Sequence, residues 1–318
     1  MTLRPASRAA VSEAVGALRE GRLIGLPTET VYGLAADAAN ARAVAGIFAA
    51  KGRPRFNPLI CHVTGSDMAA DLVEMPAAAQ ALTRHFWPGP LTLVSRRRAG
   101  APVADLVCAG LPTLAVRAPD HPVAQAVLDA FGGALAAPSA NPSGKLSPTT
   151  AADVEERLGA ALAMVLDGGP CRVGLESSIV GVEPERLVLL RPGFVTAEAL
   201  AKAAGLPIAA RASAAPLTAP GQLPSHYAPD APVRLNATEA GPEECLIGFG
   251  PVHGDFTLSD SGDLIEAAAN LFQTLRAADR TGKAIAVAPI PHLGLGLAIN
   301  DRLARAAAPR GDSENQLS

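Results

Sequence analysis

Short apolar runs alternate with amphipathic helical segments along most of this 318-residue chain. Apolar residues recur at helical spacing in 8–20 and again in 41–51, and the apolar run 23–28 between them is typical of a buried strand. Further strand-like and helical runs follow in the same alternation. A chain with this pattern buries its helices against a sheet, so we predict an α/β domain over residues 1–205.

The ends of the first two predicted helices are marked by residues that favour helix termini. Ser7 and Asn40 have short side chains that accept hydrogen bonds from the first backbone N–H groups of a helix. Gly21 and Gly52 follow the last apolar positions and can adopt the left-handed conformation that ends a helix. These four residues therefore predict where both helices begin and end.

Residues 206–231 interrupt the alternation. Pro, Ala and Ser dominate this segment and no periodicity remains, so we predict an interdomain linker. Its second half differs, because prolines enclose the adjacent His226 and Tyr227 and stiffen the backbone there. We expect that half to act as a lid. Residues 232–318 return to strands and helices and predict a second, smaller α/β domain with a parallel sheet.

Composition excludes several classes of protein. The chain lacks a run of about 18 apolar residues and the apolar core of a signal peptide, so we expect no membrane span. Its four cysteines lie far apart and none forms a C-x-x-C pair, which indicates a reduced, cytoplasmic protein. The net charge of −3 argues against a protein that binds nucleic acid mainly through its phosphates.

Polar residues follow the first predicted strand, and cations follow the second predicted helix. Thr28, Glu29 and Thr30 lie at the carboxyl end of the strand, where open α/β sheets bind ligands. Lys51 and Arg53 lie where the helix ends, before a proline-framed loop. Neighbouring cations suit a polyphosphate, although a solvated helix end stabilised by the helix dipole shows the same residues. The loop, with its Arg55 and Asn57, and the following His62 favour the phosphate interpretation.

Four more segments carry polar residues next to strands. Arg117 ends an apolar strand, where it either clamps a substrate carboxylate or pairs with a carboxylate of the protein. A turn rich in Ser, Pro and Gly can bind phosphate or ribose and carries Ser139, Asn141, Ser143 and Ser147. Later strand ends carry Ser177, Ser178 and Arg191.

Six motifs connect these residues: PTETVYGL, KGRPRFNPLICH, SANPSGKLSPT, ESSIV, LRPG and PGQLPSHYAP. In this order and with this spacing they resemble the motifs of the YrdC-like L-threonylcarbamoyladenylate synthases, in their long two-domain form. The resemblance implies a twisted, YrdC-like domain with a mixed sheet, followed by a smaller Rossmann-like domain with a parallel sheet.

The resemblance also implies roles for single residues. Lys51 and Arg53 match the family's phosphate-binding pair and are expected to be catalytic. The residues implied to bind ATP are Arg53, Asn57, Thr113, Ser139, Ser147, Arg191 and Tyr227. The residues implied to bind L-threonine are Thr30, His62, Arg117, Ala137 and Ser177 or its neighbour Ser178. The metal ligands stay unknown.

The implied reaction joins L-threonine to bicarbonate, and the resulting carbamate attacks the α-phosphate of ATP as pyrophosphate leaves. Cations and Mg²⁺ are then expected to stabilise the negative charge that accumulates. The product is expected to pass to a transferase that modifies tRNA, which implies a cytoplasmic enzyme with, at most, weak RNA binding.

Other interpretations stay open at this point. A YrdC-like domain could be a double-stranded RNA or tRNA-binding module, although the near-neutral charge of this chain disfavours it. It could also belong to the carbamoyl-transfer domains of hydrogenase maturation, but the zinc-finger and acylphosphatase segments of that type are not visible. The C-terminal domain could have a purely regulatory role.

Overall fold

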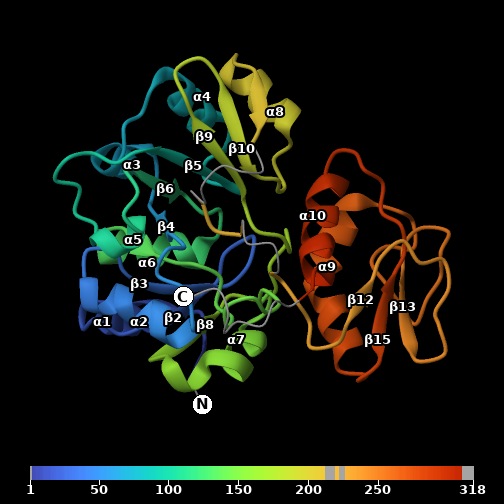
Figure 1. Ribbon diagram of the computed structural model, residues 1–318. Coiled ribbons are helices and arrows are strands. Elements are labelled where there is room, and N and C mark those ends of the chain that lie inside the picture. Colours follow the sequence, from blue (N-terminus) through green and yellow to red (C-terminus); the bar gives the residue numbers. More distant parts are fainter. Residues whose placement is uncertain (1, 212–218, 222–225, 310–318) are drawn as a thin grey trace, which may run out of the picture. The chain divides into compact units, whose positions relative to one another are not determined.

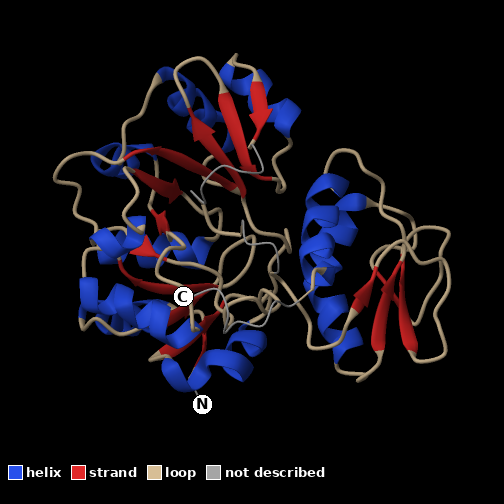
Figure 2. Ribbon diagram, viewed as in Figure 1, coloured by secondary structure: helices blue, strands red, loops and turns tan. Residues whose placement is uncertain are grey.

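The computed structural model describes residues 2–211, 219–221 and 226–309 (Figure 1). The chain divides into two compact units. Unit 1 comprises Met1–Ser143 and Ser147–Gln222, and unit 2 comprises Gly144–Leu146 and Leu223–Ser318. Helices and strands make up much of both units (Figure 2).

The strands of unit 1 form one eleven-stranded sheet in the order β1-β8-β2-β3-β7-β4-β6-β5-β9-β10-β11. They are β1 (Leu3–Pro5), β2 (Ile24–Leu26), β3 (Gly33–Asp37), β4 (Ile60–His62), β5 (Leu91–Arg96), β6 (Thr113–Arg117), β7 (Leu135–Ala136), β8 (Met164–Asp167), β9 (Ser178–Val182), β10 (Leu187–Arg191) and β11 (Ile208–Ala210). Pairs such as β4 with β6 are parallel and pairs such as β5 with β6 are antiparallel, so the predicted mixed sheet is confirmed.

The helices of unit 1 connect these strands and pack on the sheet. They are α1 (Arg8–Arg19), α2 (Ala41–Lys51), α3 (Ser66–Leu72), α4 (Ala77–Phe86), α5 (Asp105–Cys108), α6 (Pro122–Phe131), α7 (Ala151–Leu158), the short 3-10 helix η1 (Gly159–Ala161) and α8 (Ala197–Ala204). The predicted caps are confirmed: Ser7 accepts a hydrogen bond at the start of α1, Asn40 does so for α2, and Gly52 ends α2 in the left-handed conformation.

The predicted linker begins with ordered structure. β11 pairs in parallel with β10, so the sheet of unit 1 continues five residues past residue 205, the predicted end of the domain. A three-residue strand gives no measurable periodicity, which explains why the sequence did not reveal it. The linker positions 212–218 and 222–225 lie outside the described residues, and the predicted domain boundaries stay a prediction.

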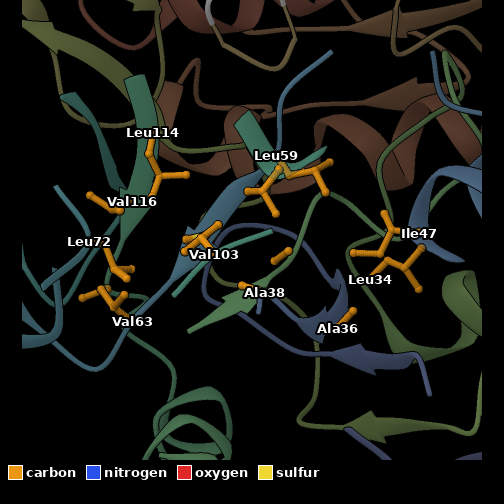
Figure 3. Packing of buried hydrophobic residues seen from close by; sticks show 14 of the residues in the cluster. Leu34, Ala36, Ala38, Ile47, Leu59, Val63, Leu72, Val103, Leu114 and Val116 are labelled. Carbon is orange, nitrogen blue, oxygen red and sulfur yellow. The ribbon is translucent and has the colours of Figure 1, made fainter. Parts of the chain in front are cut away.

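Both faces of the sheet near β3 are buried, because consecutive side chains of a strand point in opposite directions. Leu34 and Ala36 face one core, together with Ile47 of α2 (Figure 3). Ala35, between them, faces a second core with residues of α1 and α6. Alanine at these strand positions leaves room for the helices to approach closely, which suits a chain with only 3% aromatic residues.

One part of the sheet has a face on which no described helix packs. This helix-free face consists of Ile60 of β4, Val94 of β5, Ala115 of β6 and Ile179 of β9. Ala219, from the predicted linker, packs against these four residues and is 1% exposed. The opposite face of the same strands belongs to the main core, so helices cover the sheet here from one side only.

Unit 2 is a smaller parallel α/β unit. Its strands are β12 (Val233–Arg234), β13 (Glu244–Gly248), β14 (Phe256–Thr257) and β15 (Ala284–Val287), and its helices are α9 (Leu264–Asp279) and α10 (Gly296–Ala307). The strands pair in the order β12-β15-β13-β14 and every pair is parallel, as predicted. Within the described ranges, none of the helices in either unit combines the length and apolar character that a bilayer span requires.

Candidate functional site

Side chains predicted to bind substrate lie on the helix-free face. His62 lies two residues after Ile60, and Arg117 lies two residues after Ala115, so each shares the face of its neighbour. The parallel register pairs His62 with Arg117 directly. The end of β4 and the end of β6 therefore bring these two predicted threonine-binding residues side by side.

The same alternation adds residues from the neighbouring strands. Thr113 lies two residues before Ala115 and is half-buried at the start of β6. Thr92 of β5 lies on this face too, and its Oγ1 is 2.7 Å from Oγ of Ser177. Ser178 is different, because its hydroxyl is bonded to the backbone N–H and C=O of Val195. Ser177 thus shares the helix-free face with Thr92, whereas the hydroxyl of Ser178 is used within the protein, and the serine that binds threonine stays a prediction.

Arg117 is buried and its guanidinium makes three contacts. Nη1 donates to Oγ1 of Thr30 at 2.8 Å, and Nε donates to the carbonyl of Gly89 at 3.3 Å. Nη2 lies 2.7 Å from Oε1 of Glu29, so the ion pair with a protein carboxylate is present. A guanidinium has five N–H donors. Nη1 uses one N–H for Thr30, and Nη2 makes no hydrogen bond with the described residues, so each terminal nitrogen keeps an N–H that a carboxylate can accept.

His62 is held in its neutral form. Burial, and secondarily the nearby charge of Arg117, lower the pKa of His62 to about 3. Its Nδ1 is buried and has no hydrogen-bond partner among the described residues. A neutral imidazole offers one donor and one acceptor, so His62 can bind a hydroxyl group without adding charge to the site.

Arg191 organises the neighbouring part of the site. Its Nε and Nη2 donate to the carbonyl oxygen of Ser177 at 3.1 and 2.9 Å, and Nη2 also donates to Oγ of Ser177 at 3.2 Å. Nη1 lies 3.5 Å from the carbonyl of Pro220, in the predicted linker. Arg191 is 4% exposed, so it carries a buried positive charge at this edge of the site.

Lys51 and Arg53 are both buried, and their side chains donate hydrogen bonds to backbone carbonyls of neighbouring loops. Nζ of Lys51 donates to the backbone carbonyls of Ser139 and Asn141, which fastens the Ser-rich turn to the end of α2. Burial, and then the charge of Arg53, lower the pKa of Lys51 well below its usual range. Arg53 donates to the carbonyls of Asn57 and Pro58, within the proline-framed loop. The interpretation of Lys51 and Arg53 as a solvated helix end is therefore wrong, because both side chains are under 8% exposed.

Two other predicted site residues have well-defined surroundings. Ser147 is fully buried and donates a hydrogen bond to the carboxylate of Glu176. The backbone N–H of Ala137 donates to the carbonyl of Ile60, which joins the strand end at Ala137 to β4. Glu176 favours the charged form of Lys51 through its own negative charge, so the buried cations here have a buried counter-charge.

Tyr227 belongs to unit 2, and its surroundings there are apolar and cationic. The ring centroid of Tyr227 lies 4.2 Å from that of His226 and 5.7 Å from that of Phe272 in α9. The guanidinium of Arg302 in α10 lies 5.3 Å from the Tyr227 centroid, a cation–π distance. The end of the linker is therefore anchored on the helices of unit 2, and the predicted contact of Tyr227 with ATP stays a prediction.

The sequence interpretation placed Glu29 at a strand end that can bind ligands but gave it no specific role, and it assigned no role to Thr92 or Glu176. A glutamate directly after a buried strand was a usable signal, because an acid at such a position is rarely buried without a partner. Thr92 left no signal, since a threonine is ordinary in a strand. Among the described residues, His, Cys, Asp and Glu form no group of three that could hold a metal ion.

The fold and the site define a two-unit α/β protein with a buried, cation-rich binding site on a helix-free sheet face. A family model described as telomere recombination, of the Sua5, YciO and YrdC group, matches residues 16–193. A second model, described as the C-terminal domain of threonylcarbamoyl-AMP synthase, matches residues 195–308. The chain belongs to this two-domain family of threonylcarbamoyl-AMP synthases.

Similar proteins cover almost the whole chain. A threonylcarbamoyl-AMP synthase of Pyrococcus abyssi is 39% identical, over 93% of this chain and 94% of the relative. One of Bacillus subtilis is 38% identical, over 94% of this chain and 93% of the relative. The solved structure of P. abyssi Sua5 complexed with L-threonine matches with a TM-score of 0.86 and 36% identity, covering 96% of both chains.

Proposed function

We propose that this chain is a threonylcarbamoyl-AMP synthase, which converts L-threonine, bicarbonate and ATP into threonylcarbamoyl-AMP and pyrophosphate. The observation that carries the proposal is the helix-free face, where both terminal nitrogens of Arg117 keep an N–H beside a neutral His62. Both family models and the curated relatives agree with it.

The threonine site would use the residues at the ends of β4 and β6. N–H groups on the two terminal nitrogens of Arg117 would hold the substrate carboxylate, while Thr30 and Glu29 fix the guanidinium. His62 and Ser177 would bind the remaining polar groups. Holding the amine beside bicarbonate lets the amine nitrogen form a bond to carbon with loss of water, and the reaction becomes effectively intramolecular.

The nucleotide would bind beside the threonine, at the cations. The carbamate oxygen attacks the α-phosphorus of ATP and the bond to pyrophosphate breaks, so negative charge builds up on the leaving group. Lys51, Arg53 and Arg191 are buried, and buried cations act more strongly than solvated ones. An incoming polyphosphate favours the charged form of Lys51, which offsets the effect of burial on its pKa.

Mg²⁺ would enter with ATP and neutralise part of its charge. Mg²⁺ is usually held by one or two carboxylates together with substrate phosphates. The buried carboxylate of Glu176, beside Ser147, fits such a ligand.

Two residues of the predicted linker lie against this site, which supports the hypothesis that the linker acts as a lid. Ala219 packs on the helix-free face against Ile60 and Ala115, and the Pro220 carbonyl lies near Arg191. Covering the site would exclude water from a reactive carbamate and its adenylate. The product would then pass to a downstream transferase that modifies tRNA in the cytoplasm.

A role as an RNA-binding module is not favoured. Phosphate neutralisation along RNA needs exposed cations. Lys51, Arg53, Arg117 and Arg191 are each 7% exposed or less, so they suit a small enclosed ligand instead.

The test is pyrophosphate release by the full chain. With L-threonine, bicarbonate, ATP and Mg²⁺ together, pyrophosphate should appear, and omission of any one substrate should reduce it to background. Equal turnover without threonine would show that the chain hydrolyses ATP and would reject the proposal.

A further inference from the structure

Glu29 is the one buried acid of the site that the reaction as described does not engage directly. It is 1% exposed, and its side chain is fully buried. It precedes Thr30, in the loop between β2 and β3. Its backbone carbonyl accepts a hydrogen bond from the N–H of Val173, which fixes the loop position.

The carboxylate of Glu29 is close to a cation but lacks aligned donors. Oε1 lies 2.7 Å from Nη2 of Arg117. Even so, neither Oε1 nor Oε2 has a hydrogen-bond partner among the described residues. A buried ionised carboxylate is costly unless donors satisfy its lone pairs. Among the described residues nothing supplies that donor, so the surroundings of Glu29 point to a ligand or solvent.

The charges of Glu29, Arg117 and His62 cancel. Glu29 contributes one negative charge and Arg117 one positive charge, while His62 is neutral. An amino acid carries an ammonium and a carboxylate separated by a single carbon, and its net charge is zero. It can therefore enter this site without leaving an uncompensated buried charge.

We propose that Glu29 binds the α-ammonium group of the substrate while Arg117 binds its carboxylate. Glu29 thereby selects α-amino acids over carboxylates that lack the amine. Glu29 and Arg117 are in contact, and only one carbon separates the ammonium and the carboxylate of an α-amino acid. A single small ligand can therefore reach both side chains. An ammonium has three N–H donors and supplies the hydrogen bonds that Glu29 lacks. This inference rests on the proposed function, because it takes L-threonine as the substrate.

The experiment measures binding of two ligands by calorimetry, using the full chain. L-threonine is compared with 3-hydroxybutanoate, which is threonine without its amine. Wild type should bind L-threonine at least about tenfold more tightly, the factor that corresponds to one charge-assisted hydrogen bond. Glu29→Gln should weaken L-threonine binding about tenfold or more, and should leave binding of 3-hydroxybutanoate unchanged or stronger.

The control variant is Asp153→Asn, which removes another buried carboxylate. Asp153 accepts backbone hydrogen bonds at the start of α7, so its loss should lower the melting temperature without changing the preference between ligands. Equal weakening of both ligands by Glu29→Gln would mean that Glu29 only positions Arg117, and would overturn the proposal. Unchanged affinity for L-threonine in that variant would also overturn it.

The wild-type comparison stands even where Glu29→Gln does not fold. If wild type binds both ligands equally, the amine is not recognised and the proposal is wrong. If wild type binds neither ligand but still turns over ATP, the proposed function fails first. The two failures are therefore distinguishable.

Discussion

Replacing Arg117 by lysine keeps the buried positive charge and removes the planar guanidinium. Arg117 now contacts Thr30, Gly89 and Glu29 at 2.8, 3.3 and 2.7 Å. A single ammonium at the end of a lysine chain can keep the ion pair with Glu29, but its donors do not form a planar fork. We therefore expect Arg117→Lys to lose two hydrogen bonds within the protein and the paired contact with the substrate.

The magnitude follows from these contacts. Two buried hydrogen bonds of about 1 kcal/mol each lower the free energy of unfolding by roughly 2 kcal/mol. For a domain of this size that corresponds to a fall in melting temperature of roughly 4–8 °C. Loss of one charge-assisted bond to the substrate should raise the KM for threonine about tenfold or more. The KM for ATP should stay close to that of wild type.

Thermal melting and pyrophosphate release, measured on the same preparations, separate the two effects. Arg97→Lys is the matched control, because Arg97 also combines an ion pair, with Asp105 at 2.7 Å, and bonds to backbone carbonyls. It should cost stability and leave the KM for threonine unchanged. If Arg117→Lys melts at a lower temperature but keeps the wild-type KM for threonine, Arg117 serves the fold alone and the carboxylate clamp is refuted.

Three other perturbations test the remaining parts of the site. Lys51→Ala and Arg53→Ala should each weaken ATP binding about tenfold or more, because each removes a charge-assisted contact. Wild-type ATP affinity in both variants would mean that the two residues only hold the loops together. His62 has a native pKa of about 3, below its usual 6.5, so the unfolded chain takes up the proton first and the stability present above about pH 6.5 is lost as the pH falls. Urea unfolding at about pH 7 and about pH 4 should show a smaller loss for His62→Gln than for wild type, and an identical loss would contradict this. ATP and L-threonine should slow proteolysis within 206–231, and Tyr227→Ala should reduce synthesis. If cleavage is equally fast with and without substrates and Tyr227→Ala is fully active, the segment is only a tether.

Local features of the fold were predictable from the sequence. Ser7, Asn40 and Gly52 occupy the predicted ends of α1 and α2, because a cap depends on residues within one turn of the helix end. The alternation of strands and helices predicted an α/β fold with a second, parallel unit, and the six motifs indicated the family. α3 and the strand β11 were not predicted, because short elements carry little periodic signal. α4 and α8 are amphipathic helices that the sequence analysis did not identify.

The composition of the site from distant segments was decided by the tertiary structure. The order of the eleven strands brings the ends of β4 and β6 together, and the register sets His62 beside Arg117. The sequence left two roles open for Arg117; the structure shows the ion pair with Glu29, and the clamp on a substrate carboxylate stays a prediction. The structure likewise separated Ser177 from Ser178 by the face that each occupies.

The physical reason for this division is the range of the interactions involved. Helix caps and amphipathic periodicity arise from contacts between neighbouring residues, so they can be read from a short stretch of chain. Strand order and register arise from burying apolar faces contributed by segments up to hundreds of residues apart, and a shift of one residue would turn every side chain of a strand to the other face. The residue types of this site could therefore be identified from the sequence, whereas their placement together on one helix-free face depended on the packing of the whole sheet.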